Sequence, residues 1–528
     1  MTHQSAPAFR WPTALVVLAG VLSLTAARTS AQDGGAGGIV ARLNDSLVTV
    51  DSARRSEPII LPAIAKLEAP PAIVASVDEA RLIPADAKGF AAAAAWAQAA
   101  PQQAAIAAVA AVTKEEDWRK SMIFAQPYGA DSISPELIRA GAYTELDDPP
   151  TLAWAKIGYL PMLDRLEVLV NVEATRLAAD SKANEALDLL VNFEYFARQI
   201  CDRRFLVEAQ WGLRASGRTY ERMRDIACVD ARGPKNLHPE RIKAAINRMN
   251  ADGVLDLSRM KFPSGNRLGA EQMVERLYNE SGQVRNDVFP TTMARLGTGG
   301  KPLRLFSQSA RWRTAAAEQV SASDAKAKIR LIYDDWERRW AGMYFDLKLQ
   351  GRASPYSDLD KSKNAVVALA TPEMSNLIHE RQQVICEGVG TRLSLALIAQ
   401  WYVTGAIPPQ VTAVRPRWIK AVEADPFNDR SVDRGGAPPP QYFIPTKRGN
   451  VTAHSMDVVT NSIRGDANFS LKLKDDTFVL YSLGTDTADN FAARIQNTTQ
   501  VVQSADYLLF PPVLSLYRQN LRDRGDIE

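Results

Sequence analysis

Three consecutive segments between residues 163 and 227 repeat apolar side chains with the period of an α-helix, and this pattern constrains the fold more than any other feature of the sequence. The connections near Asp180 and Asp202 are short, and short connections make consecutive helices antiparallel neighbours. We therefore expect a helical bundle or an array of repeat-like helical hairpins. The apolar positions are Leu163, Leu166, Leu169, Ala174 and Leu177, then Ala186, Leu190, Phe193, Ala197 and Ile200, and then Leu206, Leu213, Tyr220 and Ala227.

The character of the chain changes after Pro408, where proline and glycine become dense and short alternating runs appear at 441–445, 468–473 and 477–483. Alternation of apolar and polar side chains predicts strands. The second and third runs flank Lys474-Asp475-Asp476, which predicts a hairpin with a polar turn. We therefore expect a mainly α-helical chain with a small C-terminal α+β module.

The N-terminus has the features of an export signal. Arg10 precedes an uncharged apolar run from Thr13 to Ala27, and the small residues Thr29-Ser30-Ala31 precede Gln32. This pattern predicts a signal peptide over residues 1–31 and a periplasmic or secreted protein. The alternative is an uncleaved anchor, but the run is shorter than the ~20 apolar residues that a membrane span needs. No later segment is apolar enough to span a membrane.

Composition shifts divide the rest of the chain. Glycine-rich and proline-rich pieces predict a loosely ordered lead-in over residues 32–85. An alanine-rich segment opens a helical domain over 86–387, and we expect Pro101 to kink or split its first helix. Within this domain, residues 282–310 are rich in Gly, Thr and Pro and predict a long loop. The α+β module covers 388–512, and a helical tail covers 513–528.

The charge balance argues against nucleic-acid binding, and the positions of the cysteines argue against a disulfide. Without residues 1–31 the chain has 61 basic and 60 acidic residues, so it has no general attraction to nucleic acid. The arginine run of the third helical segment is interrupted by acids, and we interpret it as a charged face of the helix and not as a nucleic-acid site. Cys201 and Cys228 lie at distant ends of two predicted helices, so we expect Cys201, Cys228 and Cys386 to be buried thiols.

Four motifs follow one another between residues 388 and 512. They are the helix end Trp401-Tyr402-Val403-Thr404-Gly405, the turn Asp425-Pro426-Phe427, the stretch from Tyr481 to Asp486, and the strand Asp506-Tyr507-Leu508-Leu509-Phe510. In this order, residues 388–512 resemble the soluble part of type II secretion pseudopilins and, more closely, a C-terminal module of uncharacterised exported bacterial proteins. Residues 182–229 are similar to a paired-helix segment of the same exported proteins. The resemblance implies a fold and no known activity.

The resemblance also implies a possible ion site. In pseudopilins, the region after the Tyr-Ser-Leu-Gly motif can hold calcium, which takes six to eight oxygen ligands. The corresponding residues here are Asp486, Asp489, Asn490 and Asp506. Ala488, Phe491 and Ala492 replace the usual glycines and further acids of that loop, so a solvated loop is the alternative, and no other cofactor is expected. Pseudopilins begin with a long apolar assembly helix, which this chain lacks, so we do not expect it to polymerise as a pilin does.

No complete catalytic motif is found in the sequence. His379-Glu380 is followed by Gln383 where a zinc helix needs histidine. Ser323 and Lys326 fit Ser-x-x-Lys formally, but a helix N-cap explains Ser323 better. The leading hypothesis is therefore an exported, non-enzymatic scaffold that binds protein partners of the cell envelope. An envelope hydrolase with dispersed catalytic residues and an accessory component of a secretion system are the alternatives.

Overall fold

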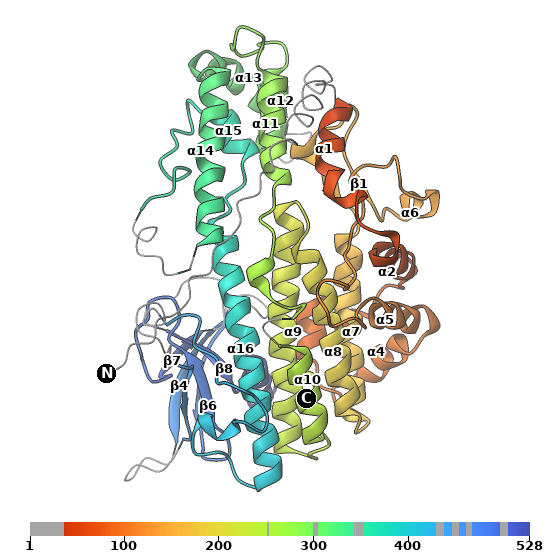
Figure 1. Cartoon of the computed structure of the whole chain (residues 1–528), viewed down its shortest axis with the longest axis vertical. Coiled ribbons are helices and arrows are strands. Elements are labelled where there is room, and N and C mark those ends of the chain that lie inside the picture. The colour runs from red at the N-terminus through yellow and green to blue at the C-terminus, as the bar shows by residue number, and fades with distance from the viewer. Residues whose placement is uncertain are drawn as a thin grey trace, which may run out of the picture.

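The computed structural model describes residues 36–250, 253–298, 305–342, 344, 352–428, 438–445, 453–460, 467–496 and 505–527. It confirms a mainly helical chain that ends in a smaller part with a sheet (Figure 1). Long helices run side by side, a smaller group of helices lies beyond one end of them, and the sheet packs against helix α16 (Ser375–Thr404). The predicted signal peptide lies outside the described residues. Across the described ranges, no helix is both long and apolar enough to cross a membrane.

The three periodic segments form helices α7 (Leu160–Ala179), α8 (Ala183–Cys201) and α9 (Leu206–Arg232). Helix α8 packs against both α7 and α9, as the short connections predicted. A Cβ built on Gly212 would lie 2.7 Å from the backbone nitrogen of Cys201, so the glycine permits the close approach of α8 and α9. The cysteines Cys201, Cys228 and Cys386 are free and buried, which confirms the prediction of buried thiols.

Much of the charged arginine stretch expected in the third helical segment is buried. Arg222 and Arg224 are buried, because α9 is enclosed by α8, α16 and α17 (Val513–Asp523), and Arg203, in the turn before α9, is buried too. A charge is tolerated in such a place only when it is paired and hydrogen-bonded. Each of these arginines accordingly meets a buried carboxylate, and the pairs are Arg203–Glu208, Arg222–Asp225 and Arg224–Glu387.

The N-terminal region is helical where we expected a loosely ordered lead-in over 32–85. It contains α1 (Ala36–Val48), α2 (Glu57–Ile64) and α3 (Val77–Leu82). Leu43, Ile60 and Leu61 are fully buried, so short apolar runs between the glycines and prolines suffice to dock these helices. Helix α2 packs on α5 (Ala100–Val112) and α3 packs on α7. The alanine-rich segment is split into α4 (Phe90–Ala97) and α5, with Pro101 in the first turn of α5.

A second group of helices contains α11 (Gly265–Leu277), α12 (Phe289–Thr298), α13 (Leu305–Ala315), α14 (Ala322–Ala341) and α15 (Ala365–Ala370). Helix α10 (Pro239–Arg248) lies against α16 and α8. The long loop expected over 282–310 is wrong, because α12 and α13 occupy most of it and Phe289 and Met293 are fully buried. The N-cap of α14 is Ser321 and not Ser323, since the Ser321 hydroxyl accepts the N–H of Asp324.

The C-terminal sheet has the order β3-β6-β8-β7-β4-β5, and it mixes antiparallel and parallel pairs. Its strands are β3 (Gln441–Phe443), β4 (His454–Thr460), β5 (Ala467–Leu473), β6 (Val479–Ser482), β7 (Arg494–Gln496) and β8 (Asp506–Phe510). The hairpin expected around Lys474-Asp475-Asp476 does not form: β5 pairs with β4, whereas β6 pairs with β3 and β8. Every residue of β6 is buried, which suits a strand inside the sheet, while the half-exposed β5 suits an outer edge.

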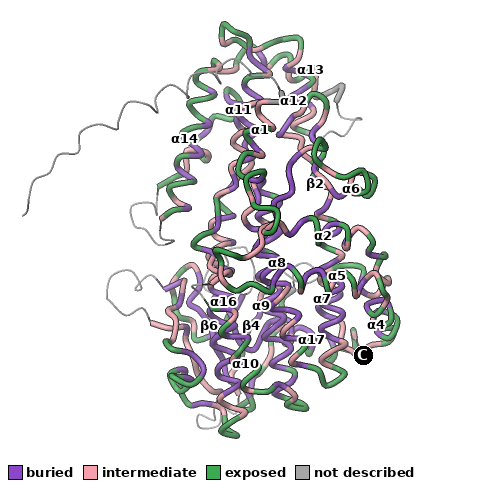
Figure 2. The backbone as a smooth tube through the Cα atoms, turned by 45° about the vertical axis from the view of Figure 1, so that its right-hand side comes forward, coloured by how far each residue is buried: buried purple, intermediate pink, exposed green. Residues whose placement is uncertain are grey.

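Helix α16 joins the sheet to the helical bundle. The expected domain boundary between residues 387 and 388 falls inside this helix, which packs on α9 on one side and on β6 and β8 on another. A Cβ built on Gly390 would lie 2.5 Å from Cδ2 of Leu509, so glycine lets β8 approach the helix. Figure 2 shows the buried backbone concentrated where α8, α9, α16 and the sheet meet. The predicted helical tail is α17, and it packs on α9, α3 and the sheet.

Candidate functional site

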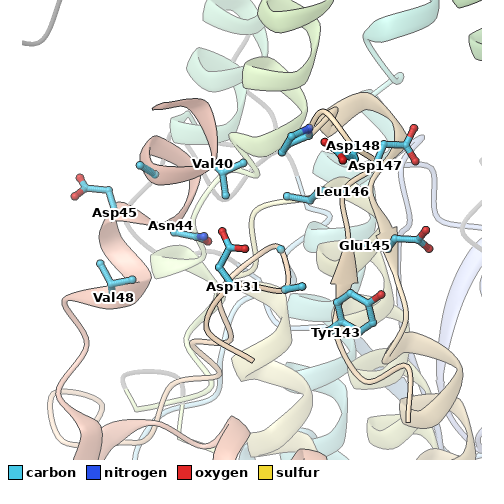
Figure 3. Close-up of a pocket in the computed structure, with 14 residues that line it drawn as sticks. Val40, Asn44, Asp45, Val48, Asp131, Tyr143, Glu145, Leu146, Asp147 and Asp148 are labelled. Atoms are coloured by element: carbon cyan, nitrogen blue, oxygen red, sulfur yellow. The ribbon is translucent and has the colours of Figure 1, made fainter. Parts of the chain in front are cut away.

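An open groove of about 930 Å³ lies between helix α1 and the segment 129–150 (Figure 3). The segment includes α6 (Pro135–Arg139) and β1 (Thr144–Glu145), and β1 pairs antiparallel with β2 (Lys156–Ile157). Apolar side chains and carboxylates both line the groove. The carboxylates are those of Asp45, Asp131, Glu145, Asp147 and Asp148.

The floor of the groove is apolar. Val40 and Leu146 project toward each other across it (Figure 3). A Cβ built on Gly129 would lie 3.7 Å from Leu146 Cδ1 and 3.9 Å from Val40 Cγ1, so these three residues adjoin. Gly129 has a φ of +95°, a conformation that residues with a side chain rarely adopt. Gly129 also forms an antiparallel bridge with Thr144, which brings Leu146 beside Gly129 and opposite helix α1.

Helix α1 is fixed to the bundle through one side of the groove. The Asn44 side chain donates to the carbonyl of Tyr128 at 2.9 Å and accepts the Tyr128 N–H at 2.8 Å. The Tyr128 hydroxyl donates to the buried carboxylate of Glu208 at 2.7 Å, and Arg203 donates to the same carboxylate at 2.8 Å. Burial raises the pKa of Tyr128 well above its ordinary value, so the hydroxyl remains a donor at any physiological pH. The groove wall is thus tied to the centre of the fold.

The charges of the groove are only partly neutralised. Lys156 pairs with Glu145 at 3.1 Å, and Arg295 pairs with Asp147 at 2.6 Å. Asp45, Asp131 and Asp148 are exposed, and none of them forms an ion pair with another described residue. Figure 3 shows Asp131 between α1 and the strand, whereas Asp45 and Glu145 point outward at opposite rims. The groove therefore carries an excess of negative charge above an apolar floor.

This arrangement suits binding better than catalysis. A general acid is usually held in a dry, apolar setting that keeps its proton at neutral pH, whereas Asp45, Asp131 and Asp148 face water. No histidine, serine or cysteine lines the groove among the described residues, so no nucleophile and base are paired there. An open acidic groove with an apolar floor can instead hold an extended segment that carries lysine or arginine and an apolar side chain.

The predicted calcium residues lie together at one end of the sheet, and each of the three carboxylates already accepts hydrogen bonds from the protein. Asp506 is fully buried and accepts the N–H groups of Asn490 at 3.3 Å and Ala492 at 2.8 Å. Asp489 accepts the Tyr481 hydroxyl at 2.8 Å, and Asp486 accepts the N–H of Ala488 at 3.1 Å. Within the described residues, no three His, Cys, Asp or Glu side chains gather in a way that could hold a metal. The residues as arranged do not fit a calcium site, and the loop is held by carboxylate-to-backbone hydrogen bonds.

The other sequence candidates are dispersed. His379 shares a hydrogen bond of 2.8 Å with Tyr344, while Glu380 pairs with Arg214 at 3.0 Å. Burial lowers the pKa of His379, which keeps the ring neutral. His454 Nε2 lies 3.1 Å from the carbonyl of Ala492. No catalytic group is assembled from these residues.

The sequence patterns did not reveal the groove, because its two walls lie far apart in the chain. The only local signal was the acidic run Glu145-Leu146-Asp147-Asp148 before Pro149 and Pro150. No protein-family model matches the chain, and no curated protein or solved structure is significantly similar to it. The groove's own geometry and charge therefore carry the functional argument.

Proposed function

We propose that this protein is an exported interaction protein of the cell envelope that binds a basic segment of a protein partner in the groove between α1 and residues 129–150. The observation that carries the proposal is the excess of unpaired carboxylates, Asp45, Asp131 and Asp148, above the apolar floor of Val40 and Leu146. Complementary charge gives such a surface selectivity for basic partners. Export rests on the sequence of residues 1–31. Among the described residues that line the groove there is no histidine, serine or cysteine, which favours binding over hydrolysis.

A second candidate is an accessory role in a secretion system. It is supported by the packing of the long helix α16 on a small mixed sheet, which is the kind of module that the pseudopilin resemblance implies. Fold similarity is a weak guide to function, so this candidate ranks below the binding groove. Co-purification with pseudopilins would favour it over the first proposal.

The binding proposal can be tested with a fluorescein-labelled peptide of alternating lysine and leucine, whose anisotropy is followed as the purified chain is added. We expect saturable binding that weakens with salt, because exposed charge pairs are screened. The double substitution Asp131→Asn and Asp148→Asn should weaken binding by roughly tenfold, at about 0.5–1 kcal/mol per exposed charge contact. Glu318→Gln, which removes an exposed carboxylate elsewhere, is the matched control.

Equal binding by the wild type, the double variant and the control would show that the groove carboxylates do not select the peptide. Cleavage of the peptide, followed by mass spectrometry, would favour the hydrolase alternative. A photo-crosslinking residue in place of Val48, which is 58% exposed at the groove, extends the test to intact cells. The captured peptide should be basic, and an acidic or neutral peptide would contradict the proposal.

A further inference from the structure

The loop between β6 and β7 has an unusual backbone. Thr487, Phe491 and Ala492 have φ angles of 55°, 54° and 53°, a region that residues other than glycine seldom occupy. A bulky aromatic residue in this conformation is a marked outlier, and such conformations persist only where the surroundings impose them. The loop is therefore held in one shape by its contacts.

Those contacts are hydrogen bonds to carboxylates. Asp506 accepts the N–H groups on both sides of Phe491, from Asn490 at 3.3 Å and from Ala492 at 2.8 Å. Asp489 accepts the N–H of Phe491 itself at 2.8 Å, and Tyr481 donates its hydroxyl to the same oxygen at 2.8 Å. Ala492 is fully buried. The backbone around Phe491 is thus fixed from three sides.

The Phe491 side chain is nevertheless 70% exposed, more than any other large apolar side chain among the described residues. An aromatic side chain that is presented rigidly loses little conformational freedom on binding, and aromatic residues dominate the energetics of protein interfaces. The Phe491 side chain is therefore suited to act as an anchor that binds in an apolar pocket of another surface.

A pocket of matching size lies elsewhere on the chain, between the segment after α3 and the C-terminus. Its volume is about 180 Å³, and Ile73, Leu82, Ile83, Pro84, Ala87 and Ile527 give it an apolar lining. An apolar cavity of about 150 Å³ accommodates benzene, so this pocket has room for one phenyl ring.

The charges at the pocket rim complement those of the loop. Lys88 is exposed at the rim and forms no ion pair with a described residue. The other charged group there, Glu79, lies 3.4 Å from the hydroxyl of Ser76, which donates to it. Exposed Asp486 and Asp489 precede Phe491 by five and two residues in the sequence. A carboxylate of the loop would thus come near a free ammonium group when the ring enters the pocket.

We propose that Phe491 of one copy of this chain binds in the apolar pocket beside Lys88 of a second copy. Anchor and pocket are different surfaces, so the contact is heterologous, and it links copies head to tail into chains or rings. One side chain and its loop cover less than the ~1,000 Å² that a stable interface requires. The association is therefore weak and depends on protein concentration.

The test is sedimentation of the purified full chain from micromolar concentrations to about 1 mM, a range in which such weak contacts are populated. The wild type should self-associate. Phe491→Ser removes the anchor and Ala87→Trp fills the pocket, and each should weaken association about 30-fold, the effect of losing one interface hot spot. Val229→Ser, which removes an apolar side chain that is 52% exposed on α9, should leave association unchanged. Unaltered circular dichroism of each variant shows that the fold is retained.

Mixing the two variants separates this proposal from other modes of association. The Ala87→Trp copy keeps its anchor and the Phe491→Ser copy keeps its pocket, so the mixture should form pairs that grow no further. A monomeric wild type at the highest concentration would overturn the proposal, and so would unchanged association of Phe491→Ser. Failure of the mixture to form pairs would show that this anchor and this pocket do not bind each other.

Discussion

Removing the Arg518 side chain should destabilise the chain far more than removing Arg522 from the same helix. The Arg518 guanidinium is buried and donates to the two oxygens of Asp225 at 2.9 and 3.0 Å. It also donates to the carbonyls of Leu82 and Arg81, at 2.8 Å each. The side chain thus joins the last helix, α9 and the N-terminal region.

The magnitude follows from burial. Asp225 is fully buried. Without Arg518, the side chains that still pair with it among the described residues are Arg222 and Ser515. Breaking a buried ion pair by removing one partner costs about 3–5 kcal/mol. Because Arg222 still pairs with Asp225, Arg518→Ala should lower the free energy of unfolding by an amount near the lower end of this range, about 3 kcal/mol. Arg522 pairs with exposed Asp86 at 2.6 Å, and such a surface pair contributes about 0–1 kcal/mol.

Urea unfolding followed by circular dichroism and tryptophan fluorescence measures both changes, and coincident transitions establish that one unfolding step is observed. Equal shifts of the urea midpoint for Arg518→Ala and Arg522→Ala would refute the reasoning. A pH series gives a second check. Burial opposes ionisation of Asp225, but Arg518 and Arg222 outweigh it and hold its pKa below the ordinary value. The stabilisation is thus present above pH ~4 and is lost at lower pH, so the cost of Arg518→Ala should shrink on acidification.

Three further predictions concern other buried contacts. Burial raises the pKa of Glu194 to about 8. Between pH ~4 and 8 the folded chain therefore binds one more proton than the unfolded chain, and its stability falls as pH rises. Glu194→Gln should reduce the difference between urea midpoints measured at pH 5 and pH 8, and an unchanged difference would contradict this prediction. Gly390→Ala should lower the free energy of unfolding by about 1–3 kcal/mol through overlap with Leu509. The control is Gly217→Ala, whose new Cβ would lie 3.8 Å from Val384, and it should raise the free energy of unfolding by up to about 1 kcal/mol. An equal loss of stability in both variants would exclude overlap as the cause. A chain ending at residue 387 should fail to fold, because it cuts α16 and removes Arg518; a soluble product with a cooperative unfolding transition would show that the bundle is independent.

The helices α7, α8 and α9 could be predicted from the sequence because their apolar period is a local property of the chain. Pairing of strands is not local, so the alternating runs at 468–473 and 477–483 were identified but the wrong partner was assigned. The groove depends on a contact between Asn44 and Tyr128, which lie 84 residues apart, and no periodicity reports such a contact. The acids from Asp486 to Asp506 were interpreted as a possible calcium site or a solvated loop, and only the hydrogen-bond geometry shows that their carboxylates hold the backbone.

The module boundary expected at residue 388 falls inside α16, and side-chain contacts cross it. The Tyr507 hydroxyl of β8 donates to Glu387 and lies 2.9 Å from the amide nitrogen of Gln383, both on the other side of the expected boundary. Glu387 also accepts from Arg224 of α9, so one buried carboxylate joins the sheet, α16 and the bundle. Separating the sheet would take the Tyr507 hydroxyl from Glu387 and would uncover the buried Glu387–Arg224 pair. The groove beside α1 and the Phe491 loop therefore belong to one body, and a copy bound through Phe491 would carry its groove in a fixed orientation.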